Sequence, residues 1–157
     1  MKFVVSKDLE HTKLLNTLMV GVSVALFVYL LFDVILHGFV IGSDISTISN
    51  TLYGNAEEFI EPILLDTLLL QVHMDLFMSL FTLMILSTIY IRLFSEKKMT
   101  KWLIHLLFIL GLITPVILLL AYLSSQFFVY MWIFTLISGH LLAMFFAVRI
   151  VKSLLHS

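Results

Sequence analysis

Four long apolar stretches dominate the pattern of hydrophobic and polar positions along this chain. They cover residues 14–37, 64–91, 102–123 and 127–148. Each is long enough to supply the roughly 20 residues that cross a hydrocarbon core of about 30 Å as a helix. The pattern therefore predicts an all-α integral membrane protein with four membrane-spanning helices.

Two of the three connections between these stretches are short. SEKKMTK joins the second stretch to the third, and Ser124-Ser125-Gln126 joins the third to the fourth. Short connections make consecutive helices antiparallel neighbours. We expect an up-down-up-down four-helix bundle that forms a single transmembrane domain over residues 1–157.

The remaining connection is a longer external segment, residues 38–62. Its content of Gly, Ser, Asn and Asp is typical of a loop. The sequence Asn-Ala-Glu-Glu that begins at Asn55 resembles a helix cap followed by acidic residues in a first turn. This pattern predicts a short helix that runs into Pro62 and the second span.

Small residues and a proline predict how the last two spans pack. Gly139, Ala143 and Ala147 recur every fourth residue, which lets membrane helices approach each other closely. Pro115 follows Gly111 by four residues, and a proline inside a helix removes a hydrogen bond. The fourth span should therefore have a tight contact face, and the third should be kinked.

Charge placement predicts the orientation of the chain in the membrane. All nine basic residues fall outside or at one end of the spans. They are Lys2, Lys7, Lys13, Arg92, Lys97, Lys98, Lys101, Arg149 and Lys152. By the positive-inside rule both termini are cytoplasmic, which makes the topology N-in/C-in. Compact loops favour a bacterial inner membrane as the location.

Composition narrows the classes of protein to which the chain can belong. Hydrophobic residues make up 61% of the 157 residues and charged residues only 12%, which leaves too little polar surface for a soluble domain. A strongly basic surface for nucleic acid is absent, since the net charge is -1. The sequence has no cysteine, which excludes disulfides and thiolate metal sites.

A group of carboxylates and histidines is expected near the outer side of the membrane. Asp33 and His37 are four residues apart and share a helix face, while Asp66 and His73 are seven apart and share another. Asp75 lies across the helix from Asp66. With no Lys or Arg nearby, these acids need a bound cation or a proton. Imidazole with carboxylate favours zinc, copper or iron, so the five residues form a candidate metal site.

Asp75 also belongs to a polar stripe with Gln71, Ser79 and Thr82, which run along one face of the second span. Such a stripe can serve as a proton or ion path. It can equally provide ordinary hydrogen bonds between helices, worth about 0.6 kcal/mol per pair.

Two further histidines are expected nearer the inner side. A count of about 1.5 Å per residue from the inner basic residues puts His105 and His140 in the inner leaflet and His37 and His73 in the outer one. His105 and His140 lie among apolar residues without a carboxylate at their depth. Neutral imidazole on an apolar wall suits axial haem ligation, and the alternative role is hydrogen bonding between helices.

The histidine positions in QVHMDLFMSLF, KWLIHLLF and SGHLLAMFF resemble those of small four-helix b-type cytochromes, with the bacterial cytochrome b561-like membrane electron carriers as the nearest group. This resemblance implies b haems held between helices, with His37 and His73 as one pair of ligands and His105 and His140 as the other. It also implies electron exchange with quinones or periplasmic partners. A larger membrane complex is a further partner that the sequence leaves open.

The sequence thus leaves three functions open. The first is a b-type haem electron carrier. The second is a divalent-metal or cation binding or transport protein that uses Asp33, His37, Asp66, His73 and Asp75. The third is a non-catalytic assembly subunit of a membrane complex. A homo-oligomer is compatible with each, and the chain has no hydrolase or nucleotide-binding motif.

Overall fold

Helices form nearly the whole of the structure. The computed structural model describes the backbone of residues 2–156 and the side chains of residues 13–156. Within this part the chain forms five helices and no strand: α1 (Lys2–Val40), α2 (Ile45–Tyr53), α3 (Leu65–Phe94), α4 (Lys98–Leu123) and α5 (Gln126–Leu155). The predicted all-α class is therefore confirmed.

Four of these helices are long and apolar enough to cross a membrane. The candidate spans are Lys13–Val40, Leu65–Phe94, Lys98–Leu123 and Gln126–Leu155, with mean hydropathies of 1.8 to 2.8. Large apolar side chains such as Phe32, Phe77 and Phe134 are exposed on the outward faces of the helices. Their exposure is compatible with contact to lipid, and the chain is an integral membrane protein.

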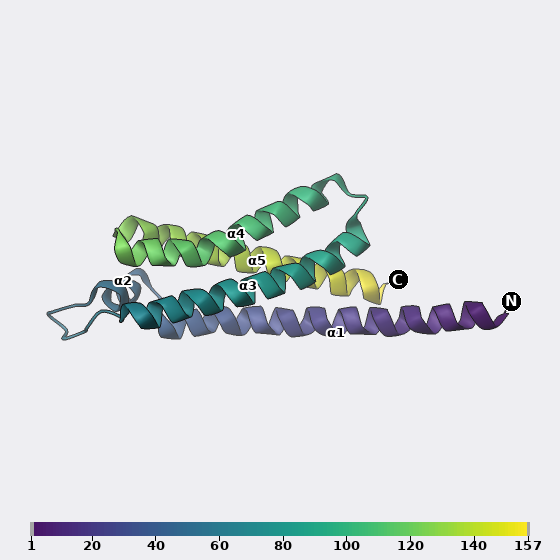
Figure 1. Ribbon diagram of the computed structural model, residues 1–157, viewed down its shortest axis with the longest axis horizontal. Coiled ribbons are helices and arrows are strands. Elements are labelled where there is room, and N and C mark those ends of the chain that lie inside the picture. Colours follow the sequence, from purple (N-terminus) through teal and green to yellow (C-terminus); the bar gives the residue numbers. More distant parts are fainter. Residues whose placement is uncertain (1, 157) are drawn as a thin grey trace.

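The long helices pack side by side around α4 and α5. α4 contacts α3 on one side and α5 on the other, and α1 lies along α5. The N- and C-termini lie at the same end of the molecule, and α1 projects beyond the other helices there (Figure 1). At that end the apolar core includes Tyr90, whose ring stacks on Phe146 with centroids 4.0 Å apart.

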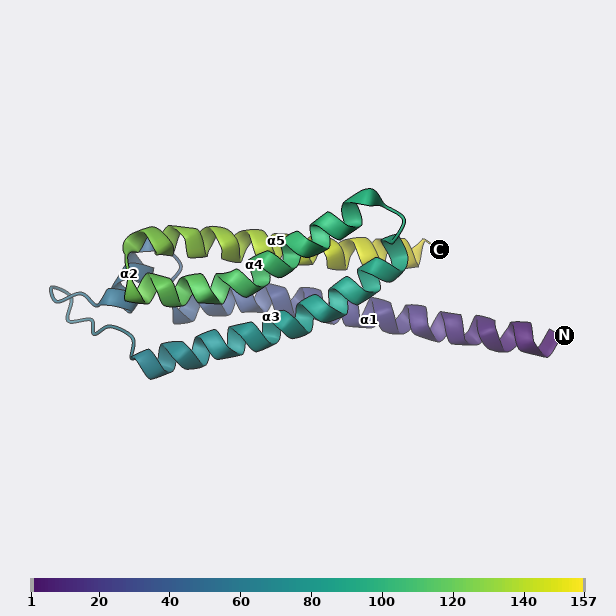
Figure 2. The ribbon, with the colours of Figure 1, turned by 45° about the horizontal axis from the view of Figure 1, so that its top comes forward.

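Small residues allow the close contacts that the sequence predicts. Ala143 and Ala147 are buried, and a methyl group added at Gly139 would lie 3.5 Å from Leu110 Cβ on α4. At Gly111 an added methyl group would come within 2.6 Å of Leu83 Cδ1, so α3 and α4 also meet closely. α4 contains Pro115 and bends near its middle (Figures 1 and 2), as predicted from this proline.

The external segment differs from its prediction. The helix lies earlier in the segment, at Ile45–Tyr53, whereas Asn55 and Ile60 close a tight turn through two backbone hydrogen bonds of 2.8 and 2.9 Å. Asp44 caps α2, since its side chain accepts a hydrogen bond from the Thr47 N–H at 3.0 Å. Hydrogen bonds from the hydroxyl and the N–H of Thr47 hold the pKa of Asp44 below its usual value. The prediction of a helix that begins at Asn55 was wrong. The helix of this segment begins after the Asp44 cap, and the residues from Asn55 to Ile60 form a turn instead.

α2 lies over the ends of the long helices that are remote from the termini (Figure 1). Its buried side chains, Ile48 and Leu52, join a second apolar cluster with Ile41, Trp132 and Leu136. This cluster covers one side of the polar network described next.

Candidate functional site

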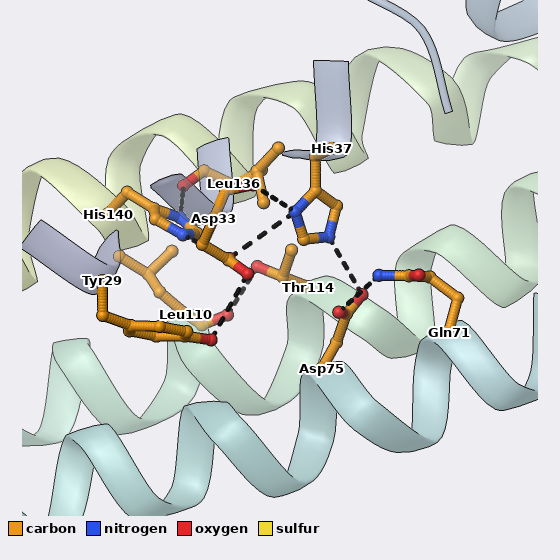
Figure 3. A network of polar contacts seen from close by, with 9 residues as sticks. All are labelled: Tyr29, Asp33, His37, Gln71, Asp75, Leu110, Thr114, Leu136 and His140. Atoms are coloured by element: carbon orange, nitrogen blue, oxygen red, sulfur yellow. Dashed lines mark hydrogen bonds and ion pairs between the residues drawn. The ribbon is translucent and has the colours of Figure 1, made fainter. Parts of the chain in front are cut away.

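Polar side chains from three helices meet in the interior of the helix assembly. Figure 3 shows that they point toward one another in one connected network. The residues are Tyr29, Asp33 and His37 of α1, Gln71 and Asp75 of α3, and His140 of α5. Each comes from one of the helices that are long and apolar enough to cross a membrane.

The helical repeat explains the local part of the network. On α1, Tyr29, Asp33 and His37 follow one another at intervals of four residues, which places them on one face. On α3 the same interval brings Gln71 Nε2 within 2.8 Å of Asp75 Oδ1, to which it donates a hydrogen bond. The predicted polar face of the second span is therefore present.

Two histidine–carboxylate pairs join the three helices. His37 Nε2 lies 3.0 Å from Asp75 Oδ2, and His140 Nε2 lies 2.8 Å from Asp33 Oδ2. The pairs are linked, since His37 Nδ1 is 3.5 Å from the same Asp33 oxygen. The order of groups is therefore Asp75, His37, Asp33 and His140. All four are well shielded, with exposed side-chain fractions between 3% and 16%.

Backbone carbonyls determine where the histidine protons lie. His37 Nδ1 is 2.8 Å from the Asp33 carbonyl oxygen, and His140 Nδ1 is 2.8 Å from that of Leu136. A carbonyl oxygen can only accept, so each Nδ1 carries a proton and donates it. Each Nε2 then meets its carboxylate through one further proton, which belongs either to the imidazole or to the carboxyl group.

This arrangement explains how acids persist here without Lys or Arg. A pair that contains an imidazolium and a carboxylate is neutral, and so is a pair that contains an imidazole and a carboxylic acid. One proton between Nε2 and the carboxyl oxygen leaves each pair without net charge. Loss of that proton would leave a net negative charge in the membrane interior, which is costly.

The remaining carboxyl oxygens also have partners. Asp33 Oδ1 accepts a hydrogen bond from the Tyr29 hydroxyl at 3.3 Å, and Asp75 Oδ1 accepts the one from Gln71. The His37 ring packs near that of Trp132, with centroids 6.1 Å apart. These contacts orient both carboxyl groups toward the histidines.

The structure brings together a different set of residues from the one expected. Asp33, His37 and Asp75 of the predicted outer group meet His140 of the predicted inner group. The assignment of His37 and His140 to opposite leaflets is therefore wrong. Asp33 follows Lys13 by 20 residues and His140 precedes Arg149 by nine, yet their side chains are in contact, so Lys13 and Arg149 do not mark the same depth.

Other predicted site residues lie outside the network. Asp66, His73 and His105 are exposed, and Asp66 accepts a hydrogen bond from the N–H of Thr67 at 2.8 Å. Glu57, Glu58 and Glu61 are exposed as well. In the part of the chain that the structure describes, no group of three or more potential ligands is arranged to hold a metal ion.

The surroundings of the histidines do not fit a haem. All four ring nitrogens of His37 and His140 already take part in hydrogen bonds. The adjoining cavity has a volume of about 50 Å³, enough for a few water molecules, each of which needs about 10–15 Å³. Binding of a haem by His37 and His140 would require both rings to leave these hydrogen bonds, and the b-type haem assignment stays a prediction.

Sequence reasoning missed the partnership of Asp33 with His140 and the contribution of Tyr29. Tyr29 could have been found from its spacing of four residues from Asp33. His140 is 107 positions from Asp33, so no local pattern relates them. The available signal was charge balance, because an acid at membrane depth without Lys or Arg calls for a histidine partner.

Fold and site together define an integral membrane protein with a buried histidine–aspartate network. Comparisons with protein-family models, curated proteins and solved structures find no match to this chain. The function must therefore be argued from the site itself.

Proposed function

We propose that this protein binds protons within the membrane and passes them along the row Asp75, His37, Asp33 and His140. This is the cation-transport interpretation, with the proton as the cation. One observation carries the proposal: two histidine–carboxylate pairs at membrane depth are linked through His37 and Asp33. Chains of Asp, Glu and His inside membrane helices are the usual elements of proton relays.

The distances support a stepwise transfer. The Asp33–His140 pair first releases its shared proton from His140 into the adjoining cavity. A proton then passes from Asp75 to His37 Nε2 over 3.0 Å, and the Nδ1 proton of His37 passes to Asp33 Oδ2 over 3.5 Å, where it is shared with His140 Nε2 at 2.8 Å. The Asp75–His37 pair takes up a new proton, which restores the protonated Nδ1 and the shared proton at Nε2.

The orientation of the protein completes the proposal. We place the basic end, with both termini, on the cytoplasmic side of a bacterial inner membrane and α2 on the opposite side. The helices would then form the up-down-up-down bundle expected from the sequence. In that frame α2 and its apolar cluster separate the network from the outer solution.

Proton flux across reconstituted vesicles tests the proposal. A potassium gradient with valinomycin drives protons, and a dye inside the vesicles reports the internal pH. Asp33→Asn and Asp75→Asn should each lower the flux at least tenfold, since neither amide can accept and release a proton. Asp66→Asn is the matched control, because Asp66 is an exposed carboxylate on the same helix as Asp75. Equal flux in wild type and Asp33→Asn would overturn the proposal.

The same preparation distinguishes the other proposals that the sequence raised. A red protein whose Soret band disappears in His140→Ala would favour the electron carrier. A colourless protein that retains zinc, copper or iron in stoichiometric amount would favour the metal-binding function. A protein without flux, haem or metal would favour the assembly subunit.

A further inference from the structure

A small cavity adjoins the histidine–aspartate network on one side. Asp33, His37, Asp75 and His140 all line it, together with Ser79 and Thr82 of α3. Its volume of about 50 Å³ is sufficient for a short row of water molecules. The network therefore has an adjoining space with polar groups along its wall.

Thr82 is the informative residue in this wall. Its side chain is only 2% exposed, and its hydroxyl has no hydrogen-bond partner within the described protein. Buried hydroxyls nearly always have a partner, and ordered water is the usual one where no protein group is available. Thr114, which also lines the cavity, differs because its hydroxyl donates to the Leu110 carbonyl at 2.7 Å.

The cavity extends from the network toward the end that holds both termini. On α3 the lining passes from Asp75 through Ser79 to Thr82, about 10 Å at 1.5 Å per residue. On α1 it reaches back to Tyr29 and on α5 onward to Ala143, both in the same direction. On the other side, α2 and its apolar cluster cover the network.

Two more buried hydroxyls, which have no hydrogen-bond partner among the described residues, lie farther toward this end. Ser87 follows Thr82 on α3, and Ser23 precedes Tyr29 on α1. Ser23 also lines a groove between α1 and α5, at whose end Lys152 and His156 lie. Leu83 and Leu107 also line the cavity and belong to the apolar core of the helix assembly. Ser23 thus lies on the groove that reaches the basic end, whereas Ser87 lies on another face of α3 from Thr82.

We propose that the cavity holds a water chain bound to Thr82, and that this chain is the path by which protons pass between the network and the basic end of the molecule. The inference rests on the proposed relay and adds its side of access. Thr82 acts as a positioning residue: its hydroxyl holds the water that contacts the network, and it does not itself gain or lose a proton.

Three substitutions on α3 test the water chain. Thr82→Val replaces the hydroxyl by a methyl group of similar size and should lower the proton flux at least tenfold. Thr82→Ser keeps the hydroxyl and should restore it. Thr88→Val is the matched control, because Thr88 is exposed and its hydroxyl already donates to the Met84 carbonyl at 2.7 Å. Wild-type flux in Thr82→Val would overturn the inference.

A second readout does not depend on transport. If Thr82 binds water, Thr82→Val loses a hydrogen bond and its melting temperature falls relative to Thr88→Val. If the cavity is dry, the substitution removes an unpaired polar group and the melting temperature rises. If Thr82→Val has the lower melting temperature but the wild-type protein carries no proton flux, the result would support the bound water and reject the proposed relay. A rise would overturn the water chain whatever the flux.

Discussion

Asp33 connects the two halves of the network. Its Oδ2 lies 2.8 Å from His140 Nε2 and 3.5 Å from His37 Nδ1, while its Oδ1 accepts from Tyr29. No other residue in the row touches both histidines. Its spacing from His37 was evident in the sequence, but its contact with His140 depends on how α1 lies against α5, which no local pattern encodes.

Substitutions at Asp33 should separate charge from hydrogen bonding. Asp33→Ala leaves His140 without its buried partner, and we expect a loss of about 3–5 kcal/mol in the free energy of unfolding. Asp33→Asn should cost less, about 1 kcal/mol, because its amide can donate to the unprotonated Nε2 of neutral His140. Unfolding in mixed micelles measures both. An equal cost for the two variants would contradict the assigned histidine protonation.

At the scale of elements, the length of the apolar stretches predicted the four long helices, whereas the start of α2 depends on a helix cap. The long helices were predictable because a stretch that spans the hydrocarbon must satisfy its backbone internally. α2 was missed because the loop-like composition of its segment conceals the cap that Asp44 forms with Thr47. Once α2 starts there, Gly54 ends it with a φ of +78°, and the acidic stretch that follows forms a turn.

Gly42 should be essential for placing α2 over the network. Its φ is +136°, and an added methyl group would lie 2.7 Å from the backbone nitrogen of Ile48. Gly42→Ala should therefore cost about 2 kcal/mol or more in stability. Gly21→Ala is the control, since nothing lies within 4 Å of its added methyl group. Its stability should be unchanged or raised by up to about 1 kcal/mol. Equal thermal stability of the two variants would show that α2 is not held in this way.

At the scale of the whole molecule, the sequence predicted four spans but not their relative depths. Depth counted along each helix assumes that the basic residues lie in one plane, and the projection of α1 breaks that assumption (Figures 1 and 2). The site could not be assembled from such depths, because a shift of one helix changes which side chains meet. The N-in/C-in orientation stays a prediction, based on the distribution of Lys and Arg.

The network joins α1, α3 and α5 through its histidine–carboxylate contacts, and nitrogen NMR of the histidines in bilayers tests the proposed proton sharing most directly. We predict that Asp33→Asn shifts the Nε2 signals of both His37 and His140 and leaves the exposed His73 and His105 unchanged. A shift confined to one buried histidine, or no shift in either, would show that the row of shared protons does not exist.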